Sequence, residues 1–300
     1  MRVMLCGGTG FIGSAVKERL LARGDHVTVV TRKPPEGQKH YVSWEEWGRD
    51  PGRWDGIDAI VNLAGESINQ RWNEASKRRI LSSRTQTAAW IADIVRNMSK
   101  PPKVVVNASG ISLYGHSGAG GDAFPDVVFD ESSPARPADF LGRTVVAWEQ
   151  AADQIPVERL VKLRIGLVLA RKGGAFPLLC LPYRLFAGGR MGSGKQGLPW
   201  IHLHDMVGLI LFSLDNPDLR GPVNAVAPNP VTNDEFGRTL GKVIDRPHWF
   251  HVPERVLRLA LGEMSVLLLT GQKAMPRKAL EHGYTFVFPS LRQALRDLAR

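Results

Sequence analysis

A glycine-rich turn near the start of the sequence has the residue types and spacing of a phosphate-binding site. The segment 8–13 (GTGFIG) fits the pattern G-x-G-x-x-G, and Gly7, Gly10 and Gly13 fit the wider G-x-x-G-x-x-G. Glycines allow a tight turn and let backbone N–H groups approach a pyrophosphate, while a following helix N-terminus adds donors and partial positive charge. An apolar segment precedes the turn and a helical pattern follows it, which favours a dinucleotide site over a turn without a ligand.

The residues after the second apolar segment indicate which dinucleotide would bind. An NAD site usually has Asp or Glu there to bond the ribose hydroxyls, whereas this chain has Thr31, Arg32 and Lys33. Two cations attract a 2′-phosphate, and an arginine can bond it through two hydrogen bonds. We therefore expect NADP(H); the alternative is that Arg32 and Lys33 are solvated loop cations.

Three hydroxyl-bearing residues follow the apolar segment 103–107. Ser109 and Ser112 could donate to a substrate oxygen, and Tyr114 could act as an acid. Without a nearby cation Tyr114 would stay protonated at pH 7, able to donate but a poor base. The alternative is that these hydroxyls satisfy the turn backbone and that Tyr114 packs.

Two other patterns resemble sites but lack essential parts. Segment 189–195 nearly completes a phosphate loop, but Gln196 replaces the Ser or Thr that holds magnesium and no apolar strand precedes it. His202 and His204 would share a strand face, but Asp205 precedes an apolar helical run and fits a helix N-cap. We therefore expect neither an ATPase site nor a metal site.

The elements that must position these residues alternate between short apolar strands and amphipathic helices. Continuously apolar strands, each followed by a helix, indicate a parallel sheet buried on both faces. The right-handed crossover rule then predicts an α/β fold with a doubly wound Rossmann-type sheet. The pattern predicts strands over 2–6, 26–31, 58–63, 103–107 and within 160–169, and helices over 14–23, 74–98 and 140–152.

The chain changes character after about residue 170. Glycine and proline become frequent, and an apolar helix over 254–270 and an amphipathic one over 289–299 are predicted near the end. We expect a dinucleotide-binding domain over 1–170, to which a segment of about 200–230 returns. Residues 171–300 would mainly form a small C-terminal α/β substrate lid. The apolar residues of the predicted helix over 254–270 are expected to form the lid core rather than a subunit contact.

Composition excludes several classes of protein. With 300 residues, 43% hydrophobic and 23% charged, the chain is an ordinary globular one. Its two cysteines, Cys6 and Cys180, exclude a disulfide scaffold and indicate a reducing compartment. The formal charge of +10 is dispersed, and its densest run is only 77–79, so we expect no nucleic-acid partner. No apolar run reaches the ~18 residues of a membrane span, and the start does not resemble a signal peptide. We expect a cytoplasmic or organelle-matrix protein without membrane association, as a monomer or an oligomer.

Stretches along the whole chain resemble the extended short-chain dehydrogenase/reductase superfamily. GGTGFIG and NLAG (62–65) carry the general resemblance. Further stretches are similar to an atypical branch, the epimerase-family proteins of the bacterial YfcH and mammalian SDR39U1 type. These are VNLAGESI, RWNEASKRRILSSR, WEQAA, GGRMGSGKQGLPWIHLHDMVG, NAVAPNPVTNDEF and GQKAMPRKALEHGYTF. The resemblance implies a Rossmann domain and a small C-terminal domain with NADP(H) between them.

The resemblance also implies individual cofactor contacts. The implied contacts are Gly7, Gly10, Phe11, Ile12 and Gly13 with the pyrophosphate, Thr31 and Arg32 with the 2′-phosphate, and Leu63, Ala64, Gly65, Arg84 and Val168 further along the cofactor. Without the resemblance we would interpret Arg84 as a helix-surface cation and Val168 as part of the core.

The chain departs from the superfamily at the catalytic helix. Ordinary members use Ser or Thr with a Tyr four residues before a Lys, so that both side chains share a helix face and the cation lowers the Tyr pKa. Counting back from Trp148-Glu149 puts Gly142 at the Tyr position and Val146 at the Lys position. We therefore expect no standard proton relay, which leaves Ser109 and Tyr114 as catalytic candidates.

Three functions remain open. The first is an NADP(H)-dependent oxidoreductase that acts on an unknown small molecule beneath the lid, with hydride chemistry supplied by the nicotinamide. The second is an NADPH-binding sensor or regulatory protein with little or no turnover, which the missing relay favours. The third is a nucleotide-sugar epimerase, against which the same missing relay argues.

Overall fold

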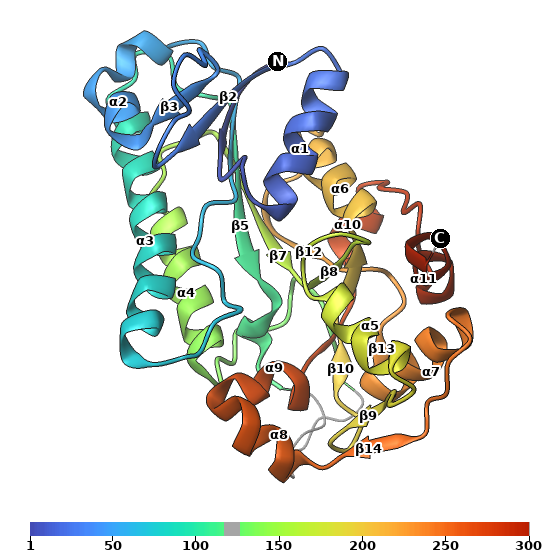
Figure 1. Ribbon diagram of the computed structural model, residues 1–300. Helices are drawn as coiled ribbons and strands as arrows, with labels where there is room; N and C mark the ends of the chain where they lie inside the picture. Colours follow the sequence, from blue (N-terminus) through green and yellow to red (C-terminus); the bar gives the residue numbers. More distant parts are fainter. Residues whose placement is uncertain (117–126, 300) are drawn as a thin grey trace.

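A seven-stranded parallel sheet runs through the computed structural model, which describes residues 1–116 and 127–299 (Figure 1). Its strands follow the order β12-β7-β5-β4-β1-β2-β3. The strands are β1 (Arg2–Cys6), β2 (His26–Thr31), β3 (Tyr41–Ser43), β4 (Ala59–Asn62), β5 (Val104–Gly110), β7 (Arg159–Ile165) and β12 (Gly221–Ala225). This is the doubly wound, Rossmann-type α/β fold that the sequence pattern predicts.

The apolar runs locate most strands correctly. β1 and β2 have the predicted bounds, and β4 is one residue shorter at each end than the predicted range 58–63. β5 instead continues to Gly110, beyond the predicted end at residue 107. Ser109 is therefore a strand residue, and strand alternation decides which way its side chain points.

Helices cover both faces of the sheet (Figure 1). One face carries α1 (Phe11–Ala22) and α6 (Leu203–Asp215), and the other carries α2 (Trp44–Arg49), the turn η1 (Pro51–Trp54), α3 (Glu74–Arg96) and α4 (Phe140–Ala152). Leu5 joins the apolar cluster under α1, while Met4 joins the one under α3, because neighbours in a strand point to opposite faces. The carboxyl ends of the strands remain uncovered by these helices and meet at one edge.

A third apolar cluster forms the centre of the C-terminal part. It collects Phe176 and Tyr183 from α5, Phe236 and Leu240 from α7, and Leu295 from α11. The helices of this part are α5 (Phe176–Arg184), α7 (Asn233–Val243), α8 (Glu254–Leu261), α9 (Val266–Leu269), α10 (Arg277–Glu281) and α11 (Leu291–Ala299).

Short strand pairs join this part to the main sheet. Two short 3-10 turns also lie in the described residues, η2 (Ile111–Tyr114) after β5 and η3 (Gly262–Ser265) after α8. The pairs are β8 (Leu167–Leu169) with β11 (Trp200–His202), β9 (Gly189–Met191) with β14 (Phe250–Val252), β10 (Gly197–Leu198) with β13 (Val231–Thr232), and β6 (Val128–Phe129) with β15 (Lys273–Ala274).

The structure corrects the prediction for residues 254–270. Gly262, with φ of 57°, ends α8 after eight residues, and the chain continues through η3 into α9. No residue of α8 is buried, and Leu259 is 90% exposed. The expectation that these apolar residues form the lid core is therefore wrong for α8, because the glycine turns the chain before the apolar side of the helix is covered. Among the described residues, no helix combines the length and apolar character that crossing a membrane requires.

Arg159, at the start of β7, fastens the end of α6 to the sheet. One guanidinium nitrogen donates to the carbonyls of Ser213 at 2.5 Å and Leu219 at 3.2 Å, and the other to the carbonyl of Leu214 at 2.8 Å. Burial, aided by the charge of Arg220, lowers the pKa of the guanidinium from its ordinary value. The last carbonyls of a helix have no partner within the helix, so Arg159 satisfies groups that would otherwise be buried and unpaired.

Replacing Arg159 with Met should therefore destabilise the protein, because the methionine fills space but leaves these carbonyls without a donor. We expect a loss of about 2–4 kcal/mol in the free energy of unfolding, seen as a lower thermal midpoint. Arg258→Met is the control, since Arg258 only pairs with Glu254 on the exposed surface of α8. Equal midpoints for the two variants would contradict this role of Arg159.

Candidate functional site

The glycine turn lies where the ends of β1 and β4 meet. Gly7 has φ of 78°, and a Cβ there would lie 2.8 Å from the backbone of Leu63. A Cβ on Gly13 would collide with the carbonyl oxygen of Gly7, and Gly10 donates its N–H to that same oxygen at 3.0 Å. Gly7 and Gly13 therefore require glycine, because backbone fills the space a side chain would need.

The first turn of α1 faces this edge with free donors. Its N-cap is Gly10, which offers no side-chain cap, and its first turn contains no acidic residue. Phe11 and Ile12 are half-buried at the start of the helix. The helix N-terminus thus presents backbone N–H groups and partial positive charge without a carboxylate to neutralise them.

Phe11 connects the glycine turn to the C-terminal part. A Cβ on Gly173 or Gly174 would lie 2.8 or 2.9 Å from the Phe11 ring, so this segment packs directly on the ring. A Cβ on Gly174 would also lie 3.3 Å from the carbonyl oxygen of Val168. The structure therefore brings the predicted contacts Phe11 and Val168 together, although Val168 itself is 7% exposed and packs in the core.

The end of β2 is cationic, as the sequence indicates. Gly7 donates its N–H to the carbonyl of Val30 at 3.4 Å, so Thr31 and the two residues after it follow directly beside the turn. Arg32 and Lys33 are exposed, and neither forms an ion pair with another residue in 1–116 or 127–299. A pair of uncommitted cations at this place suits a phosphate group on the adenosine ribose.

Arg84 reaches from α3 to the predicted contacts after β4. It donates to the carbonyls of Glu66 and Ile80, both at 3.0 Å, and its guanidinium lies 5.2 Å from the centre of the Trp148 ring. A Cβ on Gly65 would lie 3.1 Å from the guanidinium carbon. Burial lowers the pKa of Arg84 to about 10, opposed by the charge of Glu66. Arg84 is therefore a half-buried cation beside the strand end and not a surface cation of the helix.

Ser109 and Tyr114 are both committed to a buried polar network. The Ser109 hydroxyl donates to Glu149 at 2.6 Å, and Tyr114 donates to Asn224 at 2.9 Å while accepting from Arg164 at 2.7 Å. Their exposures are only 4% and 1%. The geometry therefore supports the alternative interpretation, in which these hydroxyls pack and position their neighbours, rather than a direct catalytic role.

An ion pair between Glu149 of α4 and Arg164 of β7 is the centre of this network. Arg164 donates to both carboxylate oxygens, at 2.8 and 3.0 Å. Burial raises the pKa of the Glu149 carboxyl, but Arg164 and Ser109 outweigh that effect and the pKa lies below its ordinary value. Burial also raises the pKa of Tyr114 to about 12 despite Arg164, so this phenol stays protonated. Tyr114 has the nearby cation that the sequence analysis did not anticipate.

Ser112 differs from the other two hydroxyls. It is half-buried in η2, and its hydroxyl forms no hydrogen bond with another residue that the structure describes. A Cβ on Gly142 would lie 3.0 Å from its carbonyl oxygen, so a side chain at the position expected for Tyr would require this neighbour to shift. Val146 occupies the position expected for Lys and packs with the apolar cluster beside η2. Ser112 is thus the predicted hydroxyl that stays available to a ligand.

The two patterns rejected from the sequence have structural roles. Asp205 is buried and accepts the N–H groups of Val287 at 2.8 Å and Phe288 at 2.9 Å. It is not the N-cap that was expected, because His202 takes that place by accepting from the N–H of His204 at 3.1 Å. The buried side chain of Gln196 ties two loops by donating to the carbonyls of Met191 and Leu268.

The sequence interpretation missed two ion pairs. Basic residues at 159, 162 and 164 interrupt the apolar pattern of β7, and this was the signal for a buried partner such as Glu149. Lys77 on α3 pairs with Glu263 at 2.5 Å and so joins the C-terminal part to the sheet domain. No local pattern could reveal that second pair, because its members are far apart in the sequence.

Comparisons with known proteins agree with this architecture. Residues 3–155 match the NAD dependent epimerase/dehydratase family, and residues 252–298 match a domain of unknown function, DUF1731. The epimerase family protein YfhF of Bacillus subtilis is 38% identical over 304 residues, which cover 99% of this chain and 98% of the relative. The epimerase family protein SDR39U1 of Mus musculus is 39% identical over 307 residues, which cover 99% of each. The crystal structure of human SDR39U1 (isoform 2) with NADPH is 39% identical, covers 100% of this chain and 99% of its own, and superposes with a TM-score of 0.91. The resemblance stated from the sequence motifs is thereby confirmed.

Glu149→Gln tests the buried ion pair through its pH dependence. At pH 7 the variant leaves Arg164 buried without its counter-charge, and breaking such a pair costs about 3–5 kcal/mol. Because the folded pKa of Glu149 is lowered, its contribution is complete above the ordinary value of 4.5 and is lost as pH falls through the folded pKa. The difference in thermal midpoint between wild type and variant should therefore be largest near neutral pH and shrink below pH 4.5.

The matched control is Glu45→Gln, which removes a carboxylate from an exposed pair with Arg49. It should change the midpoint very little at any pH. A difference between wild type and Glu149→Gln that stays constant from neutral to acid pH would show that the ion pair does not supply the stability.

Proposed function

The chain belongs to the NAD-dependent epimerase/dehydratase family, and we propose that it is an NADP(H)-binding oxidoreductase of the atypical extended short-chain type that acts on a small organic molecule. The observation that carries the cofactor choice is the end of β2, where Arg32 and Lys33 are uncommitted and no acidic residue directly follows the strand. The crystal structure of human SDR39U1, a relative over its full length, contains NADPH. We place the protein in a reducing compartment, the cytoplasm or an organelle matrix, since both cysteines are free.

The residues present fit this cofactor. The tight turn that would hold a pyrophosphate depends on Gly7 and Gly13, where a Cβ would collide with backbone, and the uncapped start of α1 supplies donors. The proposed contacts are Gly7, Gly10, Phe11, Ile12 and Gly13 at the pyrophosphate, Thr31 and Arg32 at the 2′-phosphate, and Leu63, Ala64, Gly65, Arg84 and Val168 beyond it. When bound, NADPH would supply hydride chemistry.

The protein itself would contribute two things to the reaction: it holds the strand ends in a fixed orientation, and it supplies one hydroxyl as a hydrogen-bond donor. The buried pair of Glu149 and Arg164 fixes the ends of α4 and β7, and through Ser109 it fixes the end of β5. We assign Ser112 as the donor to a substrate oxygen, since Ser109 and Tyr114 are bonded elsewhere. A serine can hold an oxygen in place but is a weak acid, so proton delivery would rely on water.

A sensor with little or no turnover is the second candidate. It is favoured by the missing relay, because Gly142 and Val146 stand at the positions where ordinary members have Tyr and Lys. Nucleotide-sugar epimerisation is the third candidate, and the family's name supports it. The same missing relay weighs against it, because that reaction also needs a group that removes and returns a proton.

Arg32→Glu tests the cofactor choice. The substitution places a carboxylate where we expect the 2′-phosphate, so it should weaken NADPH binding by at least tenfold and leave NADH binding nearly unchanged. Titration of both coenzymes, followed by fluorescence of the reduced ring, measures this. Arg19→Glu reverses a charge at the far end of α1 and is the control. Equal affinities of the parent protein for NADPH and NADH would refute the 2′-phosphate argument.

A turnover assay separates the enzyme from the sensor. The NADPH-loaded protein is screened against a broad panel of carbonyl compounds while absorbance of the reduced ring is followed. The enzyme hypothesis predicts oxidation with at least one compound and a rate reduced about 10- to 100-fold in Ser112→Ala, with unchanged NADPH affinity. Tight NADPH binding without oxidation across the panel would favour the sensor instead.

A further inference from the structure

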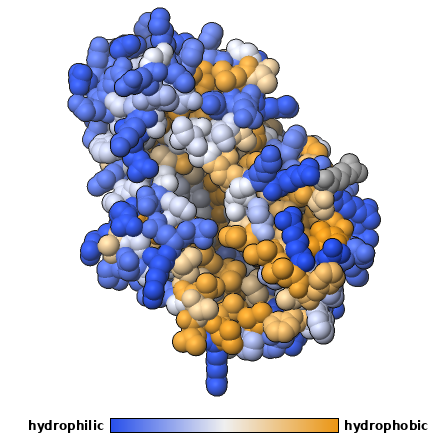
Figure 2. Space-filling model, viewed as in Figure 1, coloured by the Kyte–Doolittle hydropathy of each residue, from blue (hydrophilic) through white to orange (hydrophobic). Residues whose placement is uncertain are grey.

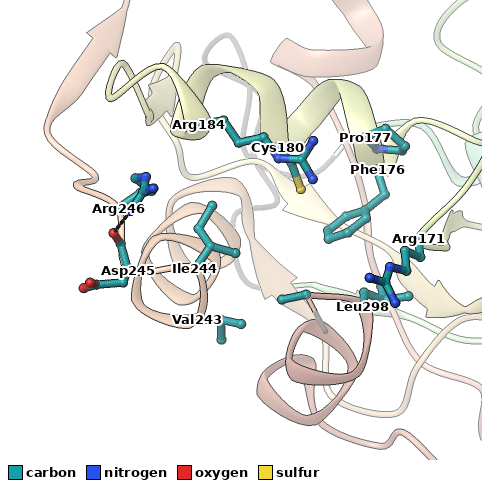
Figure 3. Close-up of a pocket in the computed structure, with 11 residues that line it drawn as sticks. Arg171, Phe176, Pro177, Cys180, Arg184, Val243, Ile244, Asp245, Arg246 and Leu298 are labelled. Carbon is teal, nitrogen blue, oxygen red and sulfur yellow. Dashed lines mark hydrogen bonds between the residues drawn. The ribbon is translucent and has the colours of Figure 1, made fainter.

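We propose that a second binding site, separate from the glycine turn, lies between α5, the end of α7 and α11, and that it takes a small organic anion with an apolar body. The structure has a cavity of about 470 Å³ at this place (Figure 3). Ligand pockets commonly measure about 300–1,000 Å³, so the cavity has a suitable size. None of the proposed cofactor contacts lines it.

The floor of the cavity is apolar and comes from three distant segments. Phe176 and Cys180 from α5 and Leu298 from α11 are almost fully buried, while Val243 and Ile244 from the end of α7 are half-buried. Figure 3 shows the Phe176 ring and the Ile244 side chain pointing toward the space between α5 and α7. A ligand placed here would bury hydrocarbon, which is favourable by roughly 25 cal/mol per Å² of apolar surface.

The rim of the cavity is cationic. The Arg184 guanidinium extends along α5 toward Cys180 and forms no ion pair or hydrogen bond with another residue that the structure describes (Figure 3). Arg171 and Arg246 add charge from two other sides. Among the lining residues that the structure describes, Asp245 is the one acid, and its carboxylate points away from Phe176 and Cys180 (Figure 3). The rim therefore favours an anionic group over a neutral or cationic one.

Arg246 supports the same conclusion. One of its terminal nitrogens donates to the backbone carbonyl of Asp245 at 2.7 Å, and its guanidinium lies 4.7 Å from the centre of the Phe186 ring. Its Nε is buried and has no hydrogen-bond partner within residues 1–116 and 127–299. Buried donors are normally satisfied, so an unpartnered guanidinium nitrogen beside a cavity indicates an acceptor that the protein alone does not supply.

The walls of the cavity are held in place by a second polar chain. The Tyr183 hydroxyl lies 2.8 Å from Nδ1 of His248, and Nε2 of His248 lies 2.9 Å from a carboxylate oxygen of Asp234. These contacts join α5 to α7 and to the segment that carries Arg246. Because these contacts hold the walls in place, the cavity is formed before a ligand binds. A preformed cavity loses less entropy on binding than one that must assemble.

Guanidinium heads and an apolar floor define the ligand class. A carboxylate or a phosphate monoester can accept two parallel hydrogen bonds from an arginine, and its hydrocarbon body would cover the floor. The head and the body should each contribute, so a molecule with both should bind better than either part alone.

Isothermal titration of the full chain, saturated with NADPH so that the glycine turn is filled, tests this. The probes are octanoate and hexyl phosphate, with inorganic phosphate and hexanol as head-only and body-only controls. We expect saturable binding of octanoate, hexyl phosphate or both, at least tenfold tighter than either control, and the stronger of the two identifies the head. Absence of saturable binding for both, or phosphate alone binding as tightly, overturns the proposal.

Two variants locate the binding. Arg184→Glu reverses the uncommitted rim charge and should weaken the better probe by at least tenfold. Ile244→Trp fills the floor from a half-buried position and should do the same without a change of charge. Arg78→Glu, on the exposed face of α3, is the matched charge reversal and should leave binding unchanged. Equal affinities for Arg184→Glu and Arg78→Glu would show that the probe binds elsewhere.

Discussion

The buried ion pair between Glu149 and Arg164 is the interaction on which the carboxyl edge of the sheet depends. Each side chain is only 9% exposed, so both charges would be costly without the other. Through hydrogen bonds the pair also holds Ser109 and Tyr114, and it thereby ties together α4, β7, β5 and η2. A reactive relay needs side chains that are free to exchange protons. Here Ser109 and Tyr114 are instead bonded to the buried ion pair.

The residues at this edge fall into two groups, those that match the superfamily's pattern and those that depart from it. Figure 2 shows a hollow between the sheet domain and the C-terminal part, with apolar side chains gathered below it. The glycine turn and the cations after β2 keep what a dinucleotide requires. The helix α4 has Gly142 and Val146 where the superfamily usually has Tyr and Lys, and a Cβ on Gly142 would lie 3.0 Å from the carbonyl oxygen of Ser112. Cofactor recognition and catalysis thus rest on different residues and can change independently.

The sequence predicts those features that depend on neighbouring residues. The apolar runs predicted the bounds of β1 and β2. The glycines of segment 7–13 predicted a tight turn, because glycine is required where one backbone segment lies against another. Features that depend on distant contacts were missed or misjudged. Ser109 was placed in a turn because its polarity hid the strand, whereas Glu149 allows it to be buried. The break at Gly262 was overlooked because hydrophobic periodicity continues across it. The cavity between α5, α7 and α11 has no signature, since its walls come from three separate segments.

The position of β12 limits how this protein can be assembled and how it can evolve. That strand completes the edge of the central sheet beside β7, yet the ribosome makes it only after α5, the pair of β8 with β11, and α6. Until then β7 has an open edge, and the guanidinium at its start lacks the carbonyls it bonds in the finished molecule. The central sheet of the nascent chain can therefore be completed only after residues from the second half of the sequence have been made. For the same reason residues 171–300 cannot be exchanged between relatives as one block, because the exchange would remove β12 from the sheet that this part covers.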